Sequence, residues 1–201
     1  MPNDSVTAYK LLLYPHAPDS APVATATLAA ALQAIGFIAG AVAVPDGVFY
    51  PAGERFLQLL VFLGCSPAIE LEPPADPAAL AAARASGAFC HVYLTAATTL
   101  QFRADRRAPA PRCPACRQPE ADWRALVERW RHDPAASAWT CRSCRHRGRL
   151  SDLHFRKTAA FSRTWVEVRG IHPAEAVPTG DLLACLQDCG GGHWQYGYLQ
   201  E

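Results

Sequence analysis

Four of the eight cysteines in this 201-residue chain form two closely spaced pairs, and these pairs constrain the fold more than any other feature. Two residues separate Cys113 from Cys116 and Cys141 from Cys144, and 24 residues lie between the pairs. Two intervening residues allow one tight turn to direct both sulfurs at a single ion, and two such turns complete a tetrahedron. The spacing therefore predicts a four-thiolate metal site. Because protein fills all four positions, we expect the metal to be structural rather than catalytic.

The segment between the two pairs has an apolar pattern typical of a helix. Trp123, Leu126, Val127 and Trp130 stand at positions i, i+3, i+4 and i+7, which places them on one face of a helix. An amphipathic helix between the cysteine turns accounts for a gap that is longer than the usual span of about 15–20 residues between paired zinc ligands.

With these features, residues 112–148 resemble zinc-ribbon proteins, including a proline inside the first cysteine turn (Pro114) and an aromatic residue two positions before the second (Trp139). The segment departs from the family because arginine, not glycine, follows each pair and because a helix occupies the span where strands are expected. The resemblance implies a structural metal and often a macromolecular partner, and it implies no reaction. Zinc is the expected cofactor since four thiolates suit it, and iron in a rubredoxin-like site is the alternative.

The charge of the chain is concentrated around this segment. Residues 103–157 hold 14 of the 19 Lys and Arg residues but 6 of the 18 Asp and Glu residues, whereas both flanks are acidic. Four of these arginines stand beside the cysteines and could offset the charge of the thiolates: Arg112, Arg117, Arg142 and Arg145. Six others are candidates for binding a partner: Arg106, Arg107, Arg124, Arg131, Arg147 and Arg149. They could bind an acidic protein or the acidic flanks of this chain, or else nucleic-acid phosphates, or they could simply be solvated.

The remainder of the chain predicts an α+β fold. Apolar alternation predicts strands at residues 9–14, 37–44, 69–71, 88–94, 98–103, 161–169 and 194–199. Helices are predicted at residues 28–35 and 181–188 and in an alanine-rich segment that ends at Gly87. For residues 56–63 periodicity does not distinguish a helix from a buried strand, and the proline before and the glycine after favour a helix. The simplest architecture is a single mixed α+β core of residues 1–103 and 158–201, with residues 104–157 inserted as a basic zinc-ribbon module.

Residues 23–44 contain no charged side chain and are long enough to span a bilayer. Their many alanines, the acidic residues that flank them and the glycine at position 36 favour instead a helix followed by a strand in a soluble protein. No secretory signal is recognised at the start of the sequence. We therefore expect a cytoplasmic protein without a membrane partner, in which paired cysteines hold metal more often than disulfides.

Candidates for a second metal site are Cys185, Cys189 and His193, which stand four residues apart. The two cysteines could share a helix face, but three consecutive glycines precede the histidine and interrupt that helix. The sequence does not decide whether these residues form a site, although buried cysteines are more often small apolar side chains.

The pattern as a whole favours a binding protein over an enzyme. The sequence contains no glycine-rich phosphate loop, no Gly-x-Ser-x-Gly elbow and no His-Glu-x-x-His helix. We therefore expect a zinc-binding adaptor that presents an arginine-rich surface to a macromolecule, a protein first and nucleic acid second. The alternative is an enzyme whose pocket lies in the α+β core near His91, His172 or Glu175, with the zinc module as a lid or docking element.

Overall fold

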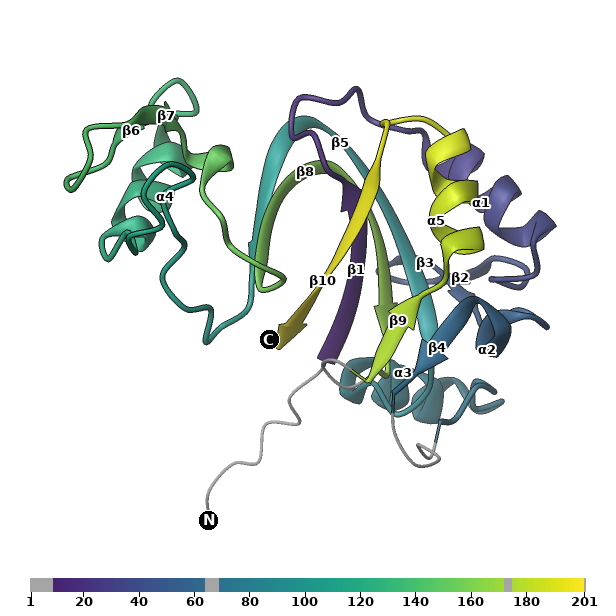
Figure 1. Cartoon of the computed structure of the whole chain (residues 1–201). Helices are drawn as coiled ribbons and strands as arrows, with labels where there is room; N and C mark the ends of the chain where they lie inside the picture. The colour runs from purple at the N-terminus through teal and green to yellow at the C-terminus, as the bar shows by residue number, and fades with distance from the viewer. Residues whose placement is uncertain (1–8, 64–68, 172–174, 201) are drawn as a thin grey trace, which may run out of the picture.

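The computed structural model describes residues 9–63, 69–171 and 175–200 (Figure 1). These residues form a six-stranded sheet in which each neighbouring pair of strands is antiparallel. From edge to edge, the strands are β10 (Trp194–Gln200), β1 (Tyr9–Pro15), β8 (Ala159–Arg169), β5 (His91–Ala104), β3 (Gly47–Pro51) and β2 (Val42–Val44). Together with the helices, this sheet confirms the predicted α+β class.

Strands β5 and β8 are the longest in the sheet and bend together into an arch (Figure 1). Their register shifts between Ala96 and Gln101, where β5 carries extra residues. The sequence predicted two strands, at residues 88–94 and 98–103, but the structure joins them because an irregularity of this kind bends a strand without ending it. The chain leaves the arch after Ala104 and returns at Ala159, which pairs with Ala104, so residues 105–158 connect the two strands.

One face of the sheet packs against α1 (Thr25–Ala34) and α5 (Gly180–Asp188) to form the main apolar core (Figure 1). Leu28 and Leu32 of α1 and Leu182 and Leu186 of α5 are fully buried there. In each helix the two leucines are four residues apart and therefore share the face toward the sheet. Thr179 caps the N-terminus of α5, and its side chain accepts a hydrogen bond from the backbone amide of Leu182 in the first turn.

The opposite face of the sheet is also buried, because the arch curls over it. Its apolar cluster consists of Leu12, Tyr14, Ala160, Trp165 and Leu199. The segment just before β8 contacts the edge strand β10, where the carbonyl of Lys157 accepts a hydrogen bond of 2.7 Å from the amide of Tyr198. Alternating strand residues are consequently buried on both sides of the sheet.

Residues 105–158 form a module at the end of the arch (Figure 1). Helix α4 (Trp123–His132) is followed by a hairpin of β6 (Ala138–Thr140) and β7 (Arg147–Arg149) and by a short 3-10 helix, η1 (Leu150–Asp152). Helix α4 buries Trp123, Val127 and Trp130, with Leu126 half-buried, so the predicted amphipathic helix is confirmed.

The module does not have an apolar core separate from the sheet. Its buried side chains belong to one cluster that includes Phe161 of β8, and Phe102 of β5 packs against that cluster. The division into a core of residues 1–103 and 158–201 and an insertion of residues 104–157 remains a prediction, since the cluster crosses that boundary.

Several local predictions differ from the structure. Residues 56–63 form only one helical turn, α2 (Phe56–Leu59), before β4 (Leu60–Phe62), which pairs with β9 (Ala176–Pro178) far away in the sequence. Residues 69–71 form no strand, and residues 37–44 contribute β2 and an isolated bridge between Ile38 and Ala52. The alanine-rich helix is confirmed as α3 (Pro77–Ser86), which ends at Gly87 in a left-handed conformation.

The uncharged segment at residues 23–44 contains α1 and a break at Gly36, whose φ is 74°. None of the helices in residues 9–63, 69–171 and 175–200 combines the length and apolar content that crossing a bilayer requires.

Candidate metal centre

The sulfur atoms of the four paired cysteines gather at one point in the module. The Sγ atoms of Cys113 and Cys144 are 3.8 Å apart, those of Cys116 and Cys141 are 3.7 Å apart, and all four lie within 4.8 Å of one another. Sulfurs bound tetrahedrally at about 2.3 Å from zinc are about 3.8 Å apart, whereas a disulfide joins its sulfurs at about 2.05 Å. The four cysteines could therefore hold one metal ion, and they are not joined as disulfides.

The two cysteine turns repeat the same backbone geometry. In each turn, the carbonyl of the first cysteine accepts a 3.0 Å hydrogen bond from the arginine that follows the second cysteine, which is Arg117 in one turn and Arg145 in the other. Both arginines have a φ of 64°, in the left-handed region. Glycine adopts this conformation most easily, so the turns keep the backbone of a glycine-containing knuckle although arginine occupies the position. Arginine in place of glycine therefore adds a side chain at this position without altering the backbone of the turn.

Backbone amides point at the sulfurs. The amides of Cys144 and Ser143 donate hydrogen bonds to the sulfur of Cys141 and lower its pKa to about 7. The amide of Gln118 acts in the same direction on Cys116, but burial and hydrogen bonds with the neighbouring sulfurs outweigh it and raise the pKa of Cys116 to about 12. A bound cation would favour ionisation of all four, because the thiolate is the form that binds metal.

Both turns are anchored to the structured part of the module. Residue Arg112, just before the first turn, forms backbone bridges with Pro119 and His154. The second turn connects β6 to β7, and the indole of Trp139 in β6 donates a 2.9 Å hydrogen bond to the carbonyl of Arg149. Of the four arginines beside the ligands, Arg142 has an acidic partner, Asp122, at 2.5 Å. These contacts hold the ends of both turns, and none of them involves a cysteine sulfur.

Three of the six arginines predicted to bind a partner lie together. Arg106, Arg124 and Arg131 line a shallow cleft of about 280 Å³ beside α4. Arg124 donates to the carbonyls of Arg106 and Ala108 and covers the ring of Trp123. Arg131 pairs with Glu128 at 2.5 Å on the exposed side of the helix. The first of the three, Arg106, is exposed and has no ion pair with any described residue.

The other three predicted arginines are placed differently. Arg107 is exposed next to Arg106, and Arg147 is exposed on β7. Arg149 forms an ion pair with Asp19, which lies in the acidic N-terminal part of the chain, and its backbone amide donates to Asp152. Two of the six, Arg131 and Arg149, thus bind carboxylates of the same chain, and the partner Asp19 of Arg149 lies in the acidic N-terminal flank.

The structure does not assemble a second metal site at Cys185, Cys189 and His193. Both thiols donate to backbone carbonyls, Cys185 to Ala31 and Cys189 to Cys185, and burial raises the pKa of Cys185 to about 11. Among the described residues, the four cysteines of the module are the only group of three or more metal-ligating side chains close enough to share an ion.

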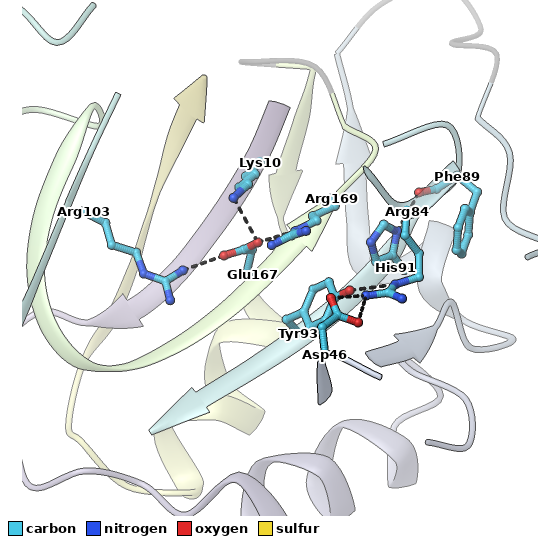
Figure 2. Close-up of polar contacts among 9 residues, drawn as sticks. All are labelled: Lys10, Asp46, Arg84, Phe89, His91, Tyr93, Arg103, Glu167 and Arg169. Atoms are coloured by element: carbon cyan, nitrogen blue, oxygen red, sulfur yellow. Dashed lines mark hydrogen bonds and ion pairs between the residues drawn. The ribbon is translucent and has the colours of Figure 1, made fainter. Parts of the chain in front are cut away.

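His91, which the enzyme alternative places near a pocket, is not exposed to solvent. This side chain is fully buried among the rings of Phe49, Phe89 and Tyr93, and Nδ1 lies 2.9 Å from the carbonyl oxygen of Phe89 (Figure 2). Burial lowers its pKa to about 4, so the ring is neutral near pH 7. His172 lies outside the described residues, and Glu175 is half-buried just before β9.

The sequence pattern does not reveal a buried charge cluster under the arch, because its residues come from three different strands. Figure 2 shows Glu167 of β8 between Lys10, Arg103 and Arg169. The carboxylate lies 3.3 Å from the ammonium of Lys10 and 2.5 Å from the guanidinium of Arg103, and its side chain is 5% exposed. Burial alone would raise the pKa of Glu167, but the charges of Lys10, Arg169 and Arg103 outweigh it and lower the pKa. This cluster ties β1, β5 and β8 together beneath the arch.

Comparison of the chain with known proteins gives no guide to its role, since no family model, no curated protein and no solved structure matches it.

Proposed function

We propose that this protein is a zinc-dependent binding protein in which one structural zinc ion holds an arginine-rich module for contact with a macromolecule. The observation that carries the proposal is the convergence of four sulfurs from two matching turns. A site made of four thiolates suits zinc, which has no redox chemistry and accepts tetrahedral geometry. We propose further that the module is a variant of the zinc ribbon, with its second knuckle carried by the hairpin of β6 and β7.

The same geometry gives the metal a structural role. Four protein ligands leave no position for a water or a substrate, so the ion would supply cohesion and no Lewis-acid chemistry. The module needs that cohesion because its regular structure is one helix and a hairpin of two three-residue strands. Iron in the same four thiolates is the alternative, and it differs from zinc in its visible absorption.

The chemistry of the exposed arginines favours an acidic partner, a protein surface before nucleic acid. The arginine ion pairs of the module, including those with Asp19, Asp122 and Glu128, already show these guanidiniums binding carboxylates. Arg106 and Arg107 remain exposed without an ion pair to any described residue. Arg106 lines the cleft together with Arg124 and Arg131, and Arg107 follows it in the sequence, which supports this edge of α4 as the contact surface.

Binding of a fluorescent poly-glutamate peptide and of a 20-nucleotide single-stranded DNA, measured by anisotropy over a salt series, tests the proposal. We expect the metal-loaded chain to bind the peptide at low salt and the Arg106→Gln/Arg107→Gln variant to bind it about tenfold more weakly. Two exposed ion pairs contribute on the order of 0.5–1 kcal/mol each, and about 1.4 kcal/mol corresponds to a factor of ten.

The control is Arg55→Gln, which removes an exposed arginine outside the module and should leave the affinity nearly unchanged. Tighter binding of DNA than of the peptide would reverse the order of the two partner classes. Failure of the metal-loaded chain to bind either probe would contradict the proposed function.

A further inference from the structure

A large cleft lies between the module and the sheet. It has a volume of about 610 Å³. One wall comes from the sheet, at the ends of β1, β8 and β10, and the other comes from the module, at residues 151–156 and at the first cysteine turn. None of the six arginines singled out for partner binding lines it, and neither does any of the four cysteines.

The lining of this cleft contains more cationic than anionic side chains. Three arginines line it, Arg112, Arg117 and Arg156, and none of them forms an ion pair with a carboxylate among the described residues. The single carboxylate in the lining, Asp152, accepts a 2.7 Å hydrogen bond from the backbone amide of Arg149. A concave surface lined by unpaired charges of one sign concentrates ions of the opposite sign. The cleft is therefore suited to an anion.

The three arginines are held by backbone geometry and not by acidic partners. Arg117 and Arg156 have φ values of 64° and 59°, in a region that L-residues adopt at a cost. Arg112 is bridged through its backbone to His154, with hydrogen bonds of 3.1 and 2.9 Å, and its guanidinium donates to the carbonyl of Arg117. The guanidinium of Arg112 thus lies against the backbone of Arg117, and both residues line the cleft from the first cysteine turn.

The remaining lining indicates the kind of anion. His16 and His154 add further hydrogen-bonding groups, while Leu153, Phe155 and Pro18 supply apolar surface. A pocket of 300–1,000 Å³ with apolar walls and a few convergent polar groups is typical of small-molecule sites. One guanidinium can donate two parallel hydrogen bonds to the oxygens of a phosphate. Several guanidiniums around one cleft therefore favour a ligand that carries more than one negative charge.

We propose that this cleft binds a nucleotide-sized phosphate ester, whose phosphate contacts Arg112, Arg117 and Arg156 and whose organic part lies against the apolar wall. This site is distinct from the surface of Arg106 and Arg107 and adds a small-molecule ligand to the proposed function. It depends on that function in one respect, because the first cysteine turn must be ordered by the metal to place Arg112 and Arg117.

Calorimetric titration of the metal-loaded chain with ADP, with inorganic phosphate and with adenosine tests the proposal. We expect ADP to bind, adenosine to bind far more weakly, and Arg156→Gln to weaken ADP binding by about tenfold. Arg112→Gln should have a similar effect. The matched control is Arg129→Gln, which removes an exposed arginine of the same module that does not line this cleft.

Metal content and poly-glutamate binding are measured on the same samples, so that a failure of this site is separable from a failure of the module. If both are intact and ADP does not bind, the cleft proposal is wrong while the proposed function stands. It is equally overturned if adenosine binds as well as ADP, if Arg129→Gln weakens ADP binding as much as Arg156→Gln, or if a 20-nucleotide single-stranded DNA binds more than tenfold tighter than ADP.

Discussion

Replacing Cys113 and Cys141 by serine is expected to remove the bound metal and to unfold most of residues 104–157. These two residues are the buried members of the two pairs, and both belong to the apolar cluster of the module. Structural zinc contributes on the order of 10–16 kcal/mol of apparent binding free energy in small zinc-finger peptides, and that energy is available to folding. The module has little regular structure, so the metal that joins its two cysteine turns is a major source of its stability beside the apolar cluster around α4.

Tryptophan fluorescence and limited proteolysis measure this loss region by region. Trp123, Trp130 and Trp139 are buried in the module, whereas Trp165 and Trp194 are buried in the sheet. We expect a red shift from the three module tryptophans and rapid cleavage between residues 104 and 157, while the cores on the two sheet faces persist. The control is Cys189→Ser, a half-buried cysteine outside the metal centre, which should retain the metal. A double variant that keeps both its metal and its protease resistance would contradict the structural role.

The second large effect is expected at Glu167. Changing Glu167 to alanine leaves Lys10, Arg103 and Arg169 without their shared carboxylate beneath the arch. Removing one member of a buried ion cluster typically costs about 3–5 kcal/mol, and here three cations lose the carboxylate that they share. Urea unfolding should show this loss as a lower midpoint. Glu128→Ala removes a carboxylate that is 59% exposed and pairs only with Arg131 among the described residues, so it should cost about 0–1 kcal/mol.

The stabilisation by Glu167 should also depend on pH in a defined direction. The pKa of this group is lower in the folded protein than its ordinary value of about 4.3. Its contribution is therefore complete above about pH 4.3 and is lost as the pH falls through the lower folded value. The difference in unfolding free energy between the wild type and Glu167→Gln should be constant near neutral pH and shrink in acid. A Glu167→Ala loss no larger than that of Glu128→Ala, or a difference that grows in acid, would contradict this account.

The sequence predicted the four-cysteine cluster and α4 because both have local signals. Two residues between cysteines define each turn, and the spacing of Trp123, Val127 and Trp130 defines the buried face of the helix. Both signals lie within a few residues of the side chains they place. The pairing of the two turns then follows from chemistry, since four thiolates complete one coordination sphere.

The features that the sequence did not reveal depend on distant parts of the chain. Strand β4 pairs with β9 more than a hundred residues away, and nothing in residues 56–63 encodes that partner. The alternation of Trp165 and Glu167 predicts one face of β8 but does not show that the arch covers this face as well. The cleft of Arg112 and Arg156 likewise exists only because the module folds against the end of the sheet.

X-ray absorption at the zinc edge of the purified protein tests the central claim most directly, because it counts and identifies the atoms bound to the metal. We predict one zinc per chain with four sulfurs at about 2.3 Å and no nitrogen or oxygen neighbour. A zinc bound by nitrogen or oxygen at about 2.0–2.2 Å, or a purified chain that contains no metal, would contradict the account.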